Sequence, residues 1–234
     1  MTEVTGAILA KDFNDLREKL SRFSGIAKIV QIDVCDGKFV PSTSWPLDKS
    51  VMGKHDPYLE KILEEEEGLP FWDKLDFEFD LMILNAISQF DFFVKLGAKK
   101  VIFHLEAENE NELKEFLESM DPYLKDNIEI GLALNNDTDI NKLDKFINSI
   151  DFIQCMGIKH IGFQGEPFDE NVLTQIKNIR KKYPEIKISI DGGVNESSAP
   201  LLIEAGVDRL VIGSALLKSY DIAETIREFE NLTI

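Results

Sequence analysis

The chain has 234 residues, of which 44% are hydrophobic, and its 43 acidic and 26 basic residues give a net charge of −17. This charge argues against nucleic acid and anionic membranes as partners, because both are bound by clustered Lys and Arg. No apolar run approaches the roughly 20 residues that span a bilayer. The first residues, Met1-Thr2-Glu3, lack the basic and apolar regions of a signal peptide, so we expect a cytoplasmic protein.

Apolar, strand-like runs alternate with helical patterns along the whole chain. The expected strands are Gly6–Ala10, Ile29–Val34, Asp76–Met82, Lys99–His104, Ile128–Leu134, Phe152–Met156, Lys187–Asp191 and Arg209–Ile212. Amphipathic helices are expected at Asp12–Phe23 (with Asp12 as the N-cap), Asn109–Met120, Glu170–Tyr183 and Tyr220–Asn231. Most strands lack clean alternation, which is typical of parallel strands buried on both faces. The pattern predicts one α/β domain over residues 1–234, a TIM-type (β/α)8 barrel, with an open doubly wound sheet as the alternative.

Residues 42–75 interrupt this rhythm. They separate two predicted strands and contain both tryptophans of the chain, Trp45 and Trp72. Connections of this length are uncommon and are usually functional or mobile. We expect an inserted segment on the C-terminal face of the barrel, acting as a lid or a subunit contact. The acidic run Glu64–Glu67 within it is interpreted as a solvated helix end and not as a metal site.

Two predicted strands end in glycine-rich turns. Asp191 is followed by Gly192 and Gly193, and the next strand is followed by Gly213 and Ser214. Glycines let the backbone approach a ligand closely, and helix starts offer free N–H groups, so neighbouring turns of this kind form a phosphate cradle at the C-terminal face of a barrel. The adjacent Asp191 carboxylate suggests proton chemistry on a phosphorylated small molecule.

The second strand carries a more specific motif. Residues 30–41 read V-Q-I-D-V-C-D-G-K-F-V-P, which resembles the H-x-D-V-M-D-G-x-F-V-P signature of the ribulose-phosphate 3-epimerase family. Other family motifs follow in order at residues 8–13, 80–83, 103–107, 133–135, 162–168, 191–195 and 213–215. The resemblance spans nearly the whole chain, although the glycine turns alone recur in many phosphate-binding barrels.

The resemblance implies an isomerase that interconverts D-ribulose 5-phosphate and D-xylulose 5-phosphate, or a related sugar phosphate, through an enediolate. Asp33 and Asp191 match the pair that moves the C3 proton, one on each face of the substrate. It further implies a small sugar phosphate as the partner, and a homo-oligomer is compatible with it. The matching phosphate-binding residues are Gly162, Gly165, Gly192, Gly193, Gly213 and Ser214. The matching substrate-pocket residues are His104, Cys35 and Phe163, with a structural role as the alternative for His104.

The metal site departs from the family pattern. The family holds a divalent metal with two His and two Asp, whereas this chain has Gln31 and Asp80 in place of the two His beside Asp33 and Asp191. Neither His55 nor His160 is at a ligand position. Oxygen ligands favour hard ions such as Mg or Mn over Zn, and three close carboxylates without a cation would raise at least one pKa. Three interpretations follow: a divalent metal (Mg, Mn or Zn), no metal with one protonated carboxyl, or a binding protein or changed reaction without epimerase activity.

Other departures lie at the substrate end. Ala7 replaces a family Ser, Gln164 replaces a glycine of the loop at 162–168, and the preceding stretch is one residue longer. Lys159 and His160 are interpreted either as exposed loop residues or as contacts to a phosphate or sugar hydroxyl. Cys35 and Cys155 are expected as buried free thiols. Aldol or decarboxylation chemistry through a Schiff base is a weaker alternative, because no lysine ends an inward-facing strand.

Overall fold

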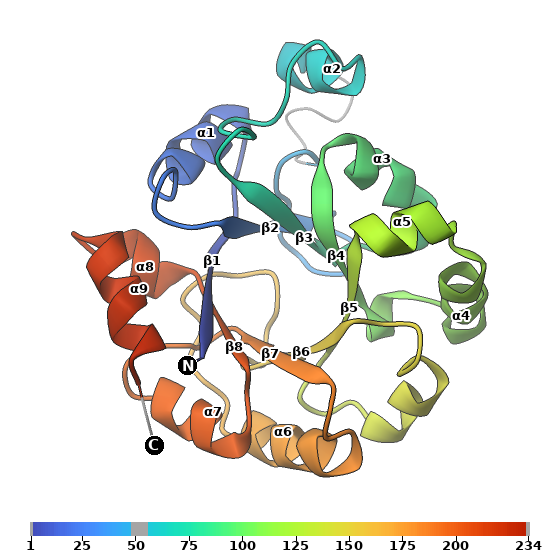
Figure 1. The fold of residues 1–234 in the computed structure, drawn as a ribbon, viewed down its shortest axis with the longest axis vertical. Coiled ribbons are helices and arrows are strands. Elements are labelled where there is room, and N and C mark those ends of the chain that lie inside the picture. Colours follow the sequence, from blue (N-terminus) through green and yellow to red (C-terminus); the bar gives the residue numbers. More distant parts are fainter. Residues whose placement is uncertain (1, 48–55, 233–234) are drawn as a thin grey trace.

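The structure, a computed structural model, describes residues 2–47 and 56–232. Eight parallel strands close into a barrel in the order β1-β2-β3-β4-β5-β6-β7-β8, with helices around it (Figure 1). The strands are β1 Glu3–Ile8, β2 Ile29–Cys35, β3 Asp76–Met82, β4 Ala98–His104, β5 Glu129–Leu134, β6 Phe152–Met156, β7 Lys187–Asp191 and β8 Arg209–Ile212. The predicted (β/α)8 barrel is thereby confirmed, and the open doubly wound sheet is wrong.

Short helices fill the connections between these strands. The α-helices are α1 Phe13–Ser21, α2 Pro57–Leu63, α3 Phe90–Lys95, α4 Glu110–Ser119, α5 Pro122–Asn127, α6 Asn171–Lys182, α7 Ala199–Ala205, α8 Ser214–Lys218 and α9 Ile222–Glu230. Three 3-10 helices are η1 Ala86–Gln89, η2 Leu105–Ala107 and η3 Ile140–Lys145. The expected N-cap is confirmed, because the Asp12 side chain accepts a hydrogen bond from the Asp15 backbone. Within the described residues, no helix is long and apolar enough to cross a membrane.

The first strand differs from its prediction. It begins at Glu3 instead of Gly6 because residues 3–6 pair with β8 across the closure of the barrel, Glu3 opposite Arg209. The apolar run after Ile8 belongs to the turn into α1. There the carbonyl of Ala10 accepts a hydrogen bond from the Trp45 backbone. The closure of the barrel, a long-range contact, therefore sets the start of this strand.

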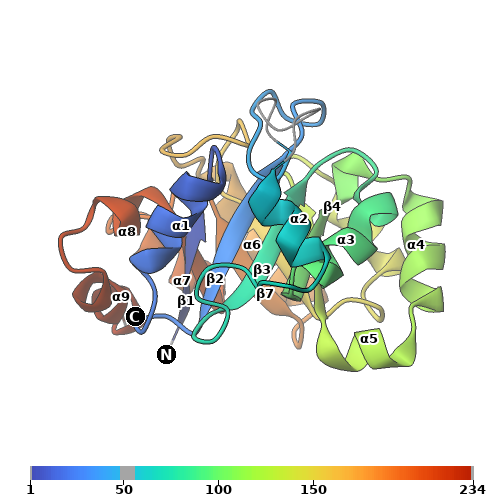
Figure 2. The ribbon, with the colours of Figure 1, turned by 90° about the horizontal axis from the view of Figure 1, so that it is seen from above.

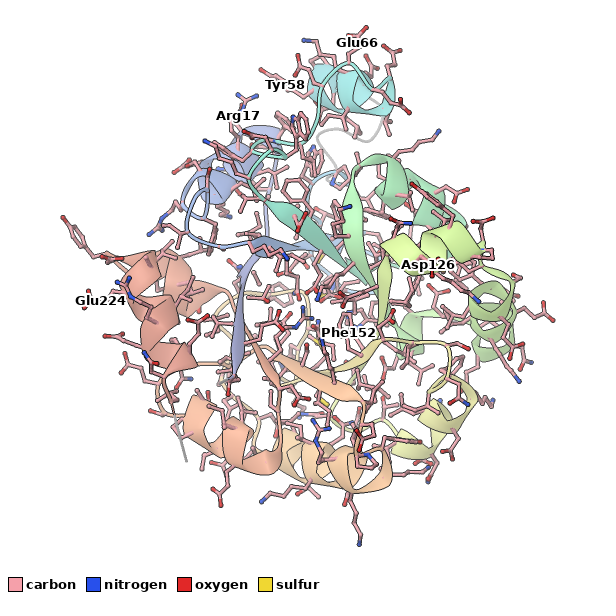
Figure 3. The ribbon with its side chains drawn as sticks, viewed as in Figure 1. Arg17, Tyr58, Glu66, Asp126, Phe152 and Glu224 are labelled. Carbon is pink, nitrogen blue, oxygen red and sulfur yellow. The ribbon has the colours of Figure 1, made fainter. Side chains whose placement is uncertain are left out.

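The barrel interior is packed by side chains from several strands. Ile102, Ala133, Phe152 and Met156 form a cluster separate from the main core between strands and helices, and Phe152 lies inside the ring of strands (Figure 3). The guanidinium of Arg209 lies 4.6 Å from the centre of the Phe152 ring. The interior is thus a solid core, and the space for a ligand must come from the loops at the strand ends.

The segment between β2 and β3 supplies helix α2 outside the barrel (Figure 1). Its Tyr58 ring stacks on Phe13 of α1, with 4.5 Å between the ring centres, and Arg17 lies over the Tyr58 ring. Tyr58 and Arg17 are labelled in Figure 3. Asp56, the N-cap residue of α2, accepts a hydrogen bond from the indole of the buried Trp45. These contacts fix the described parts of the segment against α1. Its role as a lid or subunit contact stays a prediction, and His55 lies outside the described residues.

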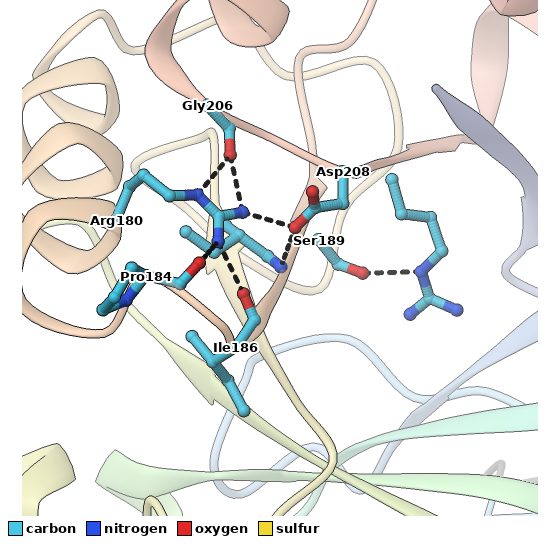
Figure 4. Close-up of polar contacts among 8 residues, drawn as sticks. Arg180, Pro184, Ile186, Ser189, Gly206 and Asp208 are labelled. Carbon is cyan, nitrogen blue, oxygen red and sulfur yellow. Dashed lines mark hydrogen bonds and ion pairs between the residues drawn. The ribbon is translucent and has the colours of Figure 1, made fainter. Parts of the chain in front are cut away.

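An arginine ties the C-terminal part of α6 to the strands that follow it. Arg180 donates hydrogen bonds to the carbonyls of Pro184, Ile186 and Gly206 and pairs with Asp208 (Figure 4). The same Asp208 carboxylate accepts a hydrogen bond from the Ile188 backbone at the start of β7. This network lies at the entry to β7 and β8 and fixes the two strands that carry the glycine turns.

The connections after β2 and β6 rise on the same end of the barrel, while both chain termini lie toward the other end (Figure 2). This shared end is the C-terminal face, where the strands finish. Because barrel enzymes build their sites from the loops at this face, we expect the chemistry of the protein there.

Candidate active site

Three carboxylates meet near the C-terminal ends of β2, β3 and β7. Asp33 and Asp80 are direct partners in the β2–β3 register, and Asp191 is the last residue of β7. One oxygen from each lies within 4.8 Å of the others. Asp80 is fully buried and Asp33 nearly so. The structure therefore brings together the three predicted aspartates.

Gln31 joins two of these carboxylates. Its Nε2 donates to Asp33 Oδ1 and to Asp191 Oδ2, both at 2.8 Å. Its Oε1 is buried without a hydrogen-bond partner. Gln31 lies two residues before Asp33 on β2, so both side chains face the barrel interior. The neutral Gln31 amide thus fixes the positions of the Asp33 and Asp191 carboxyl groups relative to each other.

The two acids have strongly shifted pKa values. Burial, followed by the nearby charges of Asp191 and Asp80, raises the pKa of Asp33 well above its ordinary value. Burial and the charge of Asp80 raise the pKa of Asp191 to about 7, although the Gln31 amide opposes the change. Both carboxyls therefore keep a proton to higher pH than an exposed aspartate does.

Asp80 has different partners. His104 Nε2 lies 2.8 Å from Asp80 Oδ1, and Gln154 Nε2 donates to Asp80 Oδ2 at 3.3 Å. All three side chains are fully buried. Burial alone would lower the pKa of His104, but the Asp80 carboxylate outweighs it and raises this pKa. The sequence reasoning missed Gln154, although a polar side chain inside an apolar strand was a signal for it.

A second buried ion pair lies one layer deeper. Arg209 Nη1 lies 2.6 Å from Glu78 Oε2, and Arg209 Nε donates to Ser189 Oγ. Burial raises the pKa of Glu78, and the Arg209 charge opposes this effect. The sequence reasoning missed this pair as well. It anchors β3 to β8 directly below the carboxylates.

A cavity of about 320 Å³ opens above the carboxylates. Asp33 and Asp191 line it, together with all the predicted phosphate-binding residues and Phe163. Gly193 has φ +69° at the β7 turn, and a Cβ there would lie 2.7 Å from the Phe168 backbone, so only glycine fits this close approach. The cavity thus joins the acid pair to both glycine turns.

His104 and Cys35 do not line this cavity. The Phe39 ring packs on His104, with 5.4 Å between the ring centres, and Cys35 packs against Val40 and Met82. The loop after β2 covers both side chains, which agrees with the structural alternative for His104, and a place in the substrate pocket stays a prediction. Burial raises the pKa of Cys35 to about 12, and both cysteines are free and buried as expected.

A loop covers one side of the cavity. Residues 162–168, here called the lid, include Phe163, whose side chain is 45% exposed. Ser42 Oγ donates to the Gly162 carbonyl at 2.5 Å, which fixes the lid to the loop after β2. His160 is exposed and lies 3.4 Å from Glu166, and Lys159 is exposed as well.

The carboxylate cluster fits a hard divalent cation. Three carboxylate oxygens lie close enough to share one ion, and a flip of the Gln31 amide would turn its unpartnered Oε1 toward them in place of Nε2. This oxygen-rich set suits Mg²⁺ or Mn²⁺ better than Zn²⁺. The cluster therefore could hold either a proton or a metal ion.

Comparisons with known proteins agree with this geometry. Residues 3–217 match the model of the "Ribulose-phosphate 3 epimerase family". The chain is 29% identical to a ribulose-phosphate 3-epimerase of Bacillus subtilis over 97% of this chain and 98% of the relative. It is 27% identical to one of Eremothecium gossypii over 95% and 89% of the two chains.

Solved structures with low identity share the fold. A structure of KGPDC from Streptococcus mutans, determined as a complex, has a TM-score of 0.69 at 13% identity, covering 98% of this chain and 96% of that chain. A 3-hexulose-6-phosphate synthase has a TM-score of 0.64 at 17% identity, with 98% of each chain covered. By the match over nearly its whole length, the chain belongs to the ribulose-phosphate 3-epimerase family, a family of enzymes that act on carbohydrate phosphates.

Proposed function

We propose that the protein interconverts D-ribulose 5-phosphate and D-xylulose 5-phosphate by moving the C3 proton. The observation that carries this proposal is the acid pair: Asp33 and Asp191 come from β2 and β7, line one cavity and are joined by one amide. Epimerisation removes a proton from one face of a carbon and returns one to the other face. It therefore needs two acid–base groups in complementary protonation states.

The raised pKa values of both acids support a form of the pair that holds one proton. Asp33 holds its proton well above the ordinary range, whereas the pKa of Asp191 lies at about 7. In the form with one proton, Asp191 removes the C3 proton while Asp33 donates its own to the opposite face. Because the two groups interact, they titrate as a pair. The reverse reaction exchanges the roles, and the Gln31 amide can donate to either carboxylate as its charge changes.

The developing oxygen charge of the enediolate also needs stabilisation. Asp33, Asp80, Asp191 and Gln31 would hold a divalent metal, for which we propose Mg²⁺ or Mn²⁺. Such an ion, when bound, supplies positive charge to the oxygens of the enediolate. His104 Nε2 and Gln154 Nε2 hold the Asp80 carboxylate in place beside this site.

The end of the cavity formed by the β7 and β8 turns is proposed to bind the phosphate. Gly192 and Gly193 after β7, and Gly213 and Ser214 after β8, line it side by side. Their backbone N–H groups can approach phosphate oxygens without a side chain in between. Gly162 and Gly165 of the lid complete this end. This arrangement supports a small sugar phosphate as the ligand.

The proposal is tested by deuterium exchange at C3 of D-ribulose 5-phosphate in heavy water, followed by NMR. Metal-free protein is compared with protein in Mg²⁺, Mn²⁺ or Zn²⁺. We expect exchange with formation of xylulose 5-phosphate, and a loss of about 10²–10⁴-fold in the Asp33→Asn and Asp191→Asn variants. Unchanged turnover in both variants would refute the assignment.

A second candidate is a binding protein that keeps the scaffold without the reaction. One observation favours it: both oxygens of Asp80 already have nitrogen partners, His104 and Gln154. That engagement weakens Asp80 as a metal ligand. Tight binding of ribulose 5-phosphate with no C3 exchange under any metal condition would support this candidate over the epimerase.

A further inference from the structure

The lid residue Gln164 reaches across the cavity to the β8 turn. Its Nε2 lies 3.2 Å from the point that a Cβ on Gly213 would occupy, and the Ala7 carbonyl lies 3.4 Å from the same point. Gly162 and Gly165 on either side have φ of +87° and +81°. The lid tip therefore places a carboxamide over the turn that follows β8.

Most of the charged residues that line the cavity are acidic, so an anionic ligand there needs hydrogen-bond donors. Among the described residues that line it, Lys218 is the single cation, and its side chain is exposed at the end of α8. Asp33, Asp191 and Glu166 line the same cavity as carboxyl groups. The protein as a whole carries a charge of −17. A phosphate dianion must therefore be held largely by uncharged N–H groups, which a carboxamide adds without desolvating a charge.

We propose that Gln164 is a phosphate-binding residue that the lid supplies, with Nε2 donating to a phosphate oxygen above Gly213. The choice of a phosphate ester as the ligand rests on the proposed function. Gln164 lies over Gly213, and the described hydrogen bonds of Asp33 and Asp191 do not include it, so we expect it to determine affinity and not the chemical step. The neighbouring His160 is less suited, because its ring faces the Glu166 carboxylate.

The test measures binding of inorganic phosphate by calorimetry and the kinetics with ribulose 5-phosphate. Gln164→Ala removes the donor, and Gln164→Glu keeps the shape but replaces the amide with a carboxylate. We expect about tenfold weaker phosphate binding for the first variant and a larger loss for the second. We expect KM to rise in proportion while kcat stays unchanged. Gln89→Ala is the matched control, because Gln89 lies outside the cavity and its side chain makes no capping hydrogen bond.

Unchanged phosphate affinity in Gln164→Ala, or equal affinities in Gln164→Ala and Gln164→Glu, would overturn the proposal. So would a wild-type protein that binds no phosphate. Melting temperatures of all variants verify that the exposed lid substitution leaves the fold intact. Phosphate binding requires no turnover. If C3 exchange is absent while Gln164→Ala still weakens phosphate binding, the epimerase assignment fails and the role of Gln164 stands.

Discussion

Replacing Asp191 by Asn should change how the stability of the protein depends on pH. Folding raises the pKa of this carboxyl from its ordinary 3.8 to about 7, first because it is buried and then because Asp80 lies nearby. The folded state therefore holds a proton that the unfolded chain has released, and wild-type stability falls as the pH rises from about 4 to about 7. At 1.36 kcal/mol per pKa unit, this loss amounts to about 4 kcal/mol. Asn is always neutral and can still accept the Gln31 hydrogen bond, so the variant avoids the loss.

The assay is urea unfolding in the presence of a chelator at several pH values between 4 and 8. As the pH rises across this range, the free energy of unfolding of Asp191→Asn, measured relative to that of the wild type, should increase by about 4 kcal/mol. Asp126→Asn is the control, because Asp126 lies exposed on α5 (Figure 3). A difference between Asp191→Asn and wild type that stays constant with pH would show that burial does not hold a proton in this pair.

Three further outcomes follow from the buried ion pairs and the cation site. His104→Ala should lower the free energy of unfolding by about 3–5 kcal/mol, because the fully buried Asp80 carboxylate loses its partner at 2.8 Å; if Asp80→Asn added to it failed to restore part of the loss, the pairing would be disproved. Arg209→Met should cost a similar amount by stranding Glu78, and an Arg209→Met variant as stable as wild type in urea would contradict this. Mg²⁺ should raise the melting temperature more at pH 8 than at pH 5, since cation binding must displace the proton of the acid pair; an equal rise at both pH values would argue against shared ligands.

Much of the fold could be predicted because the barrel repeats one local pattern. The strand bounds at Asp76–Met82, Phe152–Met156, Lys187–Asp191 and Arg209–Ile212 are confirmed to the residue. The start of β1 was missed, since its pairing with β8 joins the two ends of the chain. Several short helices, such as α3 and α5 with six residues each, were also missed. Helices this short present too few turns for the apolar period to be recognised.

The residues of the site could be predicted from the sequence, but the hydrogen bonds between them could not. Motif position and strand parity predict that Gln31, Asp33, Asp80 and Asp191 lie together, and the structure brings them together. Parity assigns a side chain to one face of a strand but does not determine its rotamer. It therefore could not show that the Gln31 amide nitrogen, and not its oxygen, faces the two carboxylates. The contact between His104 of β4 and Asp80 of β3 likewise could not be predicted, because it depends on how the side chains of the two strands pack.

The partners of the three aspartates explain how this site tolerates the loss of two histidines. Asp80 has two buried nitrogen partners of its own, His104 Nε2 and Gln154 Nε2. Asp33 and Asp191 have no basic side chain among their described hydrogen-bond partners and share only the neutral Gln31 amide. Their charge must then be relieved by a proton or by a cation. A proton makes them an acid and a base, whereas a cation makes them ligands. The two substitutions thus leave one pair of carboxylates available for both roles, with the choice set by pH and by metal concentration.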